Sequence, residues 1–345
     1  MRLRRSDTSR PGYQRRRRGK GFSYLDAHGA VITDRAELDR IRALVLPPAW
    51  EDVWICADPR GHIQATGLDA AGRRQYRYHD VWRAQRDAAK FDHVLEVGAE
   101  LPKIRAAVER DLGARGASRE RVLAAAVRLL DIGCFRIGGE EYANGADASF
   151  GLATVRREHV TVAGGRVRFC YPAKGGQERT LDVRDDGVRA VVRALLSRSD
   201  DGPELLAYRE GRRWVDVRGA DINAYLREIS GIEVTAKDFR TWNGTVLAAV
   251  TLAAAGHSST AAARRREISH AMREVADYLG NTPAVARSAY VDPRVLDLYR
   301  DGITIADTLA EVGTPQDDHD RKTVEDAVLD LLRTGDATPT SARPA

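Results

Sequence analysis

The hydrophobic periodicity of the chain changes near residue 92, and this change limits the folds that its 345 residues can adopt. Between residues 21 and 91, short runs such as 53–55 and 62–65 alternate apolar and polar side chains and are separated by turns rich in Gly, Pro and Asp. A short helix over 38–46 interrupts them. From about His93 onward, apolar residues recur at intervals of three and four, which is typical of helices. The sequence therefore predicts a small β-rich domain over 21–91 and a larger, mainly helical domain over 92–312.

The helical domain contains one predicted sheet. Residues 160–162 and 167–169 alternate around Gly164-Gly165, and a second turn at Gly175-Gly176 leads to another short run over 180–183. This pattern predicts a three-stranded antiparallel sheet with Lys174 at the tip of a hairpin. The predicted fold class is α+β.

Charge is concentrated at the two ends of the chain. The first 20 residues carry nine Lys or Arg and a single acidic residue, Asp7, although the whole chain has a net charge of only +5. We interpret residues 1–20 as a basic disordered arm that binds a polyanion, with a solvated tail as the alternative. Residues 311–345 hold eight acidic and four basic residues, so we expect 313–345 to be a peripheral acidic helix and tail.

The composition argues against several classes of protein. The longest apolar run, over 246–255, is shorter than the roughly 18 residues that span a bilayer, and we expect it to be a buried helix. The N-terminus lacks the apolar segment of a secretory signal, so a cytoplasmic, nucleoid-associated protein is expected. Three widely spaced cysteines and eight histidines show no metal-ligand spacing. No metal and no small-molecule cofactor are predicted.

Two segments carry cations at the ends of predicted elements. Ser118 is expected to cap a helix running to about Ile132, with Gly133 closing it and Arg136 following directly. Arg136 either binds an anion or pairs with Glu140 or Glu141. Lys174 either reaches into a cleft or is solvated.

Two more segments place polar side chains at helix junctions. Thr235 and Asp238 have the spacing of a capping box, which puts Arg240 in the first turns of a helix, where it binds an anion or stacks on Trp242. Thr282-Pro283 is expected to start a helix that follows Asn281 and delivers Tyr290. A lone tyrosine is more often a core residue than a nucleophile.

The ordered set of Arg136, Lys174, Arg240, Asn281 and Tyr290 resembles the catalytic residues of the poxvirus-like and bacterial type IB DNA topoisomerases. That family uses Arg, a hairpin Lys, Arg, usually His, and Tyr in the same order. The segment containing Gln75, Tyr76, Arg77 and Tyr78 is similar to the family's DNA-contacting strand. The resemblance extends over about residues 20–312. One position departs from the commoner pattern, because Asn281 stands where most members have His.

The resemblance implies a monomer that clamps double-stranded DNA between two domains and relaxes supercoils. Tyr290 would form a 3′-phosphotyrosyl intermediate, Arg136 and Arg240 would stabilise the charge on the phosphate, and Lys174 would protonate the leaving 5′-oxygen. Because the covalent link conserves the bond energy, neither ATP nor metal is expected.

Two other functions remain open. A tyrosine recombinase shares the Arg, Lys, Arg, Tyr set, but usually has a His-x-x-Arg box where this chain has Lys237, and usually has a helical N-terminal domain. A non-catalytic DNA-architectural protein would use the same basic surfaces without cutting.

Overall fold

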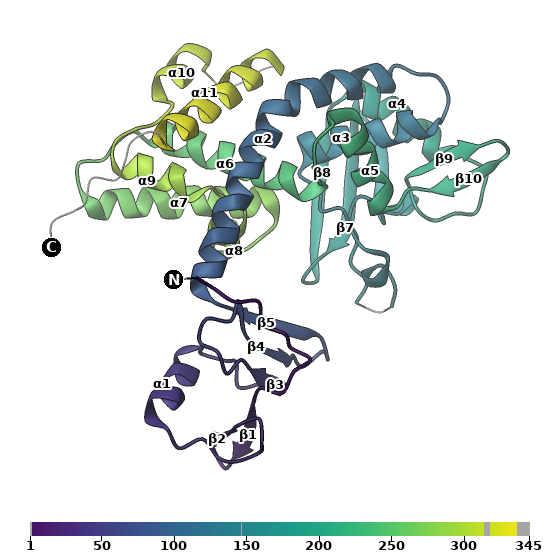
Figure 1. Cartoon of the computed structure of the whole chain (residues 1–345). Coiled ribbons are helices and arrows are strands. Elements are labelled where there is room, and N and C mark those ends of the chain that lie inside the picture. The colour runs from purple at the N-terminus through teal and green to yellow at the C-terminus, as the bar shows by residue number, and fades with distance from the viewer. Residues whose placement is uncertain (1, 146, 314–317, 337–345) are drawn as a thin grey trace. The chain divides into compact units, whose positions relative to one another are not determined.

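The computed structural model describes residues 2–145, 147–313 and 318–336 (Figure 1). The chain forms two compact units, Met1–Asp92 and His93–Ala345. Helix α2 (Asp80–Leu112) begins in the first unit and continues into the second. As the periodicity predicted, the first unit is rich in strands and the second is mainly helical.

The N-terminal unit contains a five-stranded antiparallel sheet in the order β2-β1-β3-β4-β5. Helix α1 (Arg35–Ala43) contributes Ile41 to a small core with Val53, Ile55 and Ala65. The strands are β1 (Tyr13–Arg18), β2 (Gly21–Leu25), β3 (Glu51–Ile55), β4 (Ile63–Leu68) and β5 (Arg74–Tyr78). Strand β5 therefore lies at one edge of the sheet.

The expectation of a disordered arm over residues 1–20 was wrong. Strand β1 pairs with β2 over five residues and with β3 at Tyr13 and Gln14. The side chain of Arg15 donates hydrogen bonds to the carbonyls of Leu46 and Trp50, and its guanidinium lies 4.3 Å from the centre of the Phe22 ring. A run of arginines on an exposed strand has the composition of a tail, but here one of them anchors the strand.

The second unit contains the predicted three-stranded antiparallel sheet, in the order β6-β7-β8. The strands are β6 (Val160–Ala163), β7 (Arg166–Ala173) and β8 (Gln177–Val183). Lys174 lies in the turn between β7 and β8, as expected. A second, two-stranded sheet of β9 (Ala207–Glu210) and β10 (Arg213–Asp216) was not predicted.

Helix α6 is the centre of the helical part of this unit, because it packs against α3, α7, α9, α10 and α11 (Figure 1). Its Trp242 is fully buried and lies against Gly98, where an added Cβ would come within 2.9 Å of the indole. The α-helices after α2 are α3 (Arg119–Gly133), α4 (Asp186–Leu196), α5 (Gly219–Ser230), α6 (Ala236–Ala255), α7 (Ala261–Leu279), α8 (Pro283–Ala289), α9 (Pro293–Arg300), α10 (Ala306–Val312) and α11 (Asp318–Asp336). Two short 3₁₀ helices cover Glu140–Tyr142 and Arg157–His159.

The C-terminal helix is not peripheral, which corrects the expectation for residues 313–345. Val324, Val328 and Leu332 of α11 are buried in the main core, at the spacing of one helix face. Glu325 is only 4% exposed and forms an ion pair with Arg105 of α2. The count of acidic residues concealed this amphipathic stripe. The expected tail beyond residue 336 lies outside the described residues.

Candidate active site

Arg136 follows α3, whose end differs slightly from the prediction. The residue in the left-handed conformation is Cys134, with φ 48°, and not Gly133. The backbone of Arg136 is then held by residues 151–153, because its carbonyl accepts a hydrogen bond of 2.8 Å from the Leu152 amide. Gly151 must be glycine for this approach, since an added Cβ would lie 2.6 Å from the Arg136 carbonyl oxygen. The packing therefore fixes the backbone position from which the Arg136 side chain extends.

The Arg136 side chain crosses to the segment after α7. Its Nη2 donates hydrogen bonds of 2.6 Å to the Gly280 carbonyl and of 2.6 Å to Oδ1 of Asn281. Among the described residues, Arg136 forms no ion pair with Glu140 or Glu141, which was the alternative, and Glu140 pairs with Arg218 instead. Burial lowers the pKa of the Arg136 guanidinium, and the nearby Arg240 lowers it further. Two cations are therefore held close together.

Arg240 lies in the first turns of α6, which begins with the predicted capping box of Thr235 and Asp238. The side chain is 3% exposed and donates hydrogen bonds to the carbonyls of Cys134 and, at 2.8 Å, Leu279. The ring that its guanidinium faces is that of Tyr290, at 5.1 Å from the ring centre. The predicted helix position is confirmed.

Tyr290 terminates α8, which starts with Thr282 as N-cap and Pro283 in the first turn, as predicted. The side chain is half-buried, and its backbone lies directly on α6. A Cβ on Gly244 would come within 2.7 Å of the Tyr290 carbonyl oxygen. Asp292 then caps α9 through a 2.9 Å hydrogen bond from the Arg294 amide. The tyrosine is thus held at a junction of two short helices.

A cavity of about 400 Å³ brings the hairpin lysine together with Arg136 and Asn281. Lys174 is exposed at the hairpin tip, and Gly175 and Gly176 beside it have φ values of 90° and 72°. The cavity is lined by Arg136, Ala173, Lys174, Gln177, Glu178, Arg179, Thr180, Leu181, Ala276, Asp277, Tyr278, Gly280 and Asn281. Arg136, Lys174 and Asn281 are therefore brought to one cavity, and Arg240 links Arg136 to Tyr290.

Arg179 belongs to this cluster and was missed by the sequence analysis. Its Nη2 donates a 3.0 Å hydrogen bond to the Tyr278 carbonyl. Burial lowers the pKa of Arg179, whereas the phenol of Tyr171 acts in the opposite direction. Arg179 shares its side of β8 with Leu181 and Val183, all less exposed than the residues between them. A cation at an inward position of a strand was the signal that could have identified it.

The three arginines of this site have no carboxylate partner within the described part of the chain. They bind the carbonyls of three consecutive residues at the end of α7, namely Tyr278, Leu279 and Gly280. Carbonyl groups at a helix C-terminus carry partial negative charge but no full charge. In addition, Nδ2 of Asn281 is buried without a hydrogen-bond partner. The arrangement can therefore accept an anion.

The predicted DNA-contacting residues lie on edge strand β5 of the N-terminal unit. Tyr76 and Tyr78 are 45% and 37% exposed and stack with ring centres 6.0 Å apart. Gln75 donates a 2.9 Å hydrogen bond to Asp69, and Arg77 donates to the Leu44 carbonyl and pairs with Asp80. The two tyrosines present open ring surfaces, whereas Gln75 and Arg77 already have partners within the unit.

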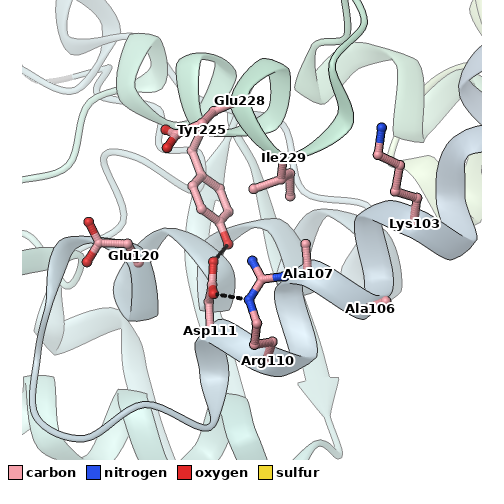
Figure 2. A pocket seen from close by; sticks show the side chains of 9 residues that line it. All are labelled: Lys103, Ala106, Ala107, Arg110, Asp111, Glu120, Tyr225, Glu228 and Ile229. Atoms are coloured by element: carbon pink, nitrogen blue, oxygen red, sulfur yellow. Dashed lines mark hydrogen bonds and ion pairs between the residues drawn. The ribbon is translucent and has the colours of Figure 1, made fainter.

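A second cavity, of about 550 Å³, lies between α2 and α5 (Figure 2). Three of its polar side chains bind each other, since Tyr225 donates a 2.7 Å hydrogen bond to Asp111 and Arg110 pairs with the same carboxylate at 3.0 Å (Figure 2). Burial and the Asp111 carboxylate raise the pKa of Tyr225. The Asp111 carboxylate is therefore already bound to two side chains, whereas the arginine cluster has no carboxylate partner among the described residues.

No group of three or more His, Cys, Asp or Glu side chains is placed to hold a metal ion in the described segments. Among the described helices, none has both the length and the apolar character needed to cross a membrane.

Both units of the chain match known protein families in sequence. Residues 79–309 match the family described as the catalytic core of eukaryotic DNA topoisomerase I, and residues 21–69 match the N-terminal domain of bacterial DNA topoisomerase IB. The chain is 29% identical to DNA topoisomerase 1B of Acanthamoeba polyphaga mimivirus over 293 residues, which cover 81% of this chain and 84% of the viral protein. The chain belongs to the type IB DNA topoisomerase family.

Proposed function

We propose that the protein relaxes supercoiled DNA by cutting and resealing one strand through Tyr290, without metal or ATP. The observation that carries the proposal is the convergence of Arg136, Lys174 and Asn281 on one cavity, together with the Arg240 guanidinium facing the Tyr290 ring at 5.1 Å. The family assignment supports a DNA topoisomerase. The roles of the individual residues are inferred from their positions and chemistry.

In the cleavage step, the Tyr290 oxygen attacks the phosphorus of a DNA phosphodiester. A bond forms between this oxygen and phosphorus, the bond from phosphorus to the 5′-oxygen breaks, and the Tyr290 proton passes to a water molecule. Lys174 gives a proton to the departing 5′-oxygen, which becomes a hydroxyl. Arg136 and Arg240 stabilise the negative charge that the non-bridging oxygens carry in the transition state.

Religation is the reverse of this step. The 5′-hydroxyl attacks the phosphotyrosyl phosphorus and gives its proton back to Lys174. The bond from phosphorus to the Tyr290 oxygen breaks, and this oxygen takes a proton from water to become the free phenol. The bonds at the start and the end are the same, so no external energy source is consumed. Rotation of the cut strand about the intact strand between the two steps changes the linking number of the DNA.

Asn281 is proposed to bind a non-bridging phosphate oxygen. Its Oδ1 accepts from Arg136, which leaves the unpartnered Nδ2 as the donor. An amide can supply this hydrogen bond but cannot add positive charge. Tyr76 and Tyr78 of β5 are proposed to contact DNA through their exposed rings. One tyrosine per cut makes a monomer sufficient.

The decisive experiment incubates the purified protein with negatively supercoiled plasmid in EDTA without ATP, beside a Tyr290→Phe variant. We expect relaxation by the wild type, no relaxation by the variant, and equal DNA binding by both. Equal relaxation by the two proteins would exclude Tyr290 as the nucleophile. DNA binding without relaxation by either protein would favour an architectural role.

A further inference from the structure

The end of helix α7 is held by three arginines that come from different parts of the chain. Arg179 of β8 binds the Tyr278 carbonyl, Arg240 of α6 binds that of Leu279, and Arg136 binds that of Gly280. The last carbonyls of a helix have no partner within the helix and need an external donor. Here each of three successive carbonyls has its own guanidinium.

Arg179 lies directly against the turn that carries Asn281. A Cβ added to Gly280 would come within 2.3 Å of Nη1 of Arg179, and Gly280 has a φ of 62°. The Nε of Arg179 is buried without a hydrogen-bond partner. The guanidinium is therefore packed beside the turn, and it donates its hydrogen bond to the carbonyl of Tyr278.

We propose that Arg179 is a positioning residue for strand cleavage, which fixes the Gly280–Asn281 turn so that Arg136 and Asn281 meet the phosphate together. The proposal rests on the function proposed above. The Asn281 side chain accepts a hydrogen bond from Arg136. The position of this side chain depends on the backbone conformation at the C-terminal end of α7, because Asn281 follows that end directly. If the Tyr278 carbonyl loses its donor, the end of α7 relaxes and the Asn281 amide moves away from Arg136.

The test compares Arg179→Ala with Arg189→Ala. Arg189 also donates to a backbone carbonyl, that of Gly165 at 3.2 Å, but it lies outside the site and is a matched control. Each protein is mixed with supercoiled plasmid, stopped with denaturant, and scored for covalent protein–DNA adduct over time. We expect Arg179→Ala to slow adduct formation by about 10- to 100-fold, the range for a lost charge-assisted hydrogen bond. Arg189→Ala should match the wild type.

The lysine variant separates positioning from general structure. Arg179→Lys keeps a donor for the Tyr278 carbonyl but loses the planar fork, so it should recover part of the rate. Thermal unfolding of all variants is measured in parallel. If Arg179→Ala does not fold, Arg179→Lys takes its place in every comparison. A cleavage rate equal to that of Arg189→Ala in the folded variant would overturn the proposal.

A double-mutant cycle with Asn281→Ala decides between positioning and direct phosphate contact. If Arg179 acts through the turn, its removal costs much less in the Asn281→Ala background than in the wild type. If the two effects multiply, Arg179 acts independently of Asn281 and the positioning role is overturned. A wild-type protein that fails to relax plasmid would instead overturn the proposed function, whatever the cycle gives.

Discussion

Two arginine clusters in the C-terminal unit differ in what neutralises them. At the candidate site, Arg136, Arg179 and Arg240 donate hydrogen bonds to carbonyl or amide oxygens and pair with no carboxylate of the described residues. In the second cluster, Arg105 and Arg321 bind the carboxylates of Asp131 and Glu325, which are 3% and 4% exposed. The same residue type is therefore left with unneutralised charge in one place and is fully paired in the other.

The two clusters are joined by one turn of α6. Asn243, three residues after Arg240, donates to the Asp131 carbonyl at 3.0 Å and to the Cys134 sulfur at 3.3 Å. The Cys134 carbonyl accepts from Arg240. The paired cluster thus links α6 to α3 and α11, and the carbonyl-bound cluster keeps the unneutralised charge that the proposed phosphate site requires. We expect mutations in the first to affect stability and mutations in the second to affect rate.

Arg136→Ala should have the largest effect. An arginine that stabilises the transition state of phosphoryl transfer contributes about 10³-fold or more. We expect the rate of covalent adduct formation to fall by about 10³-fold. The free energy of unfolding should fall by about 1–3 kcal/mol at most, because the variant loses the hydrogen bonds to Gly280 and Asn281 but leaves no buried carboxylate unpaired. Adduct formation and urea unfolding are measured on the same preparation. A loss of rate that only follows a loss of folded protein would remove the distinction between the clusters.

Asp131→Asn should lower stability and leave the cleavage rate largely unchanged. Removing one partner of a buried ion pair costs about 3–5 kcal/mol of stability, since the remaining charges stay buried. We expect a loss of this order in urea unfolding, with the cleavage rate of the folded fraction largely retained. Asp182→Asn is the control, because Asp182 pairs with Arg168 on the exposed side of the sheet and should cost less than about 1 kcal/mol. Equal costs for the two variants would contradict the prediction.

Acid should weaken the paired cluster. Burial by itself raises the pKa of Asp131, but Arg321, Arg105 and Arg128 outweigh burial and hold the pKa below its ordinary value. This carboxylate therefore contributes stability that is fully present above the unfolded pKa of about 4 and is lost as the pH falls through the lower folded value. Urea unfolding of wild type and Asp131→Asn between pH 7 and pH 2 should show the two curves converging in acid. A constant difference in the free energy of unfolding from pH 7 to pH 2 would show that protonation of Asp131 does not weaken the paired cluster.

Asn281→His should have the smallest effect. A neutral imidazole can accept from Arg136 and donate from its other nitrogen, whereas an imidazolium can only donate. We expect relaxation within about 10-fold of wild type at pH 8, and a decline below the usual imidazole value of about 6.5. The pH dependence of adduct formation checks this. A variant whose rate follows the wild-type profile throughout would show that position 281 does not accept from Arg136 during cleavage.

The local features of the site could be predicted from the sequence. Gly175-Gly176 indicated the hairpin of Lys174, Thr235 with Asp238 indicated the start of α6, and Thr282-Pro283 indicated α8. Each of these signals depends on neighbouring residues alone. The family resemblance, and not the spacing, joined the segments into one site.

The contacts between segments could not be predicted. Arg136 and Asn281 are 145 residues apart, and Arg179 is 99 residues from the carbonyl that it binds. Which carbonyl a buried arginine reaches depends on how α6 and α7 pack, and no local pattern encodes that. Charge counting also failed for α11, where the apolar stripe, rather than the acidic excess, decides that the helix is buried.

The Lys174 hairpin differs from the arginines of the site in how its side chain is held. The turn backbone is closed by a hydrogen bond from the Gly176 amide to the Ala173 carbonyl, and the flanking residues Ala173 and Gln177 are paired. The Lys174 side chain is exposed, whereas Arg240 is buried and bound to two carbonyls. A lysine carries its charge on a flexible four-carbon side chain, and a buried guanidinium does not move in this way. The proposed proton donor can therefore adjust to the position of a bound phosphate, while the position of that phosphate would be set by the arginines.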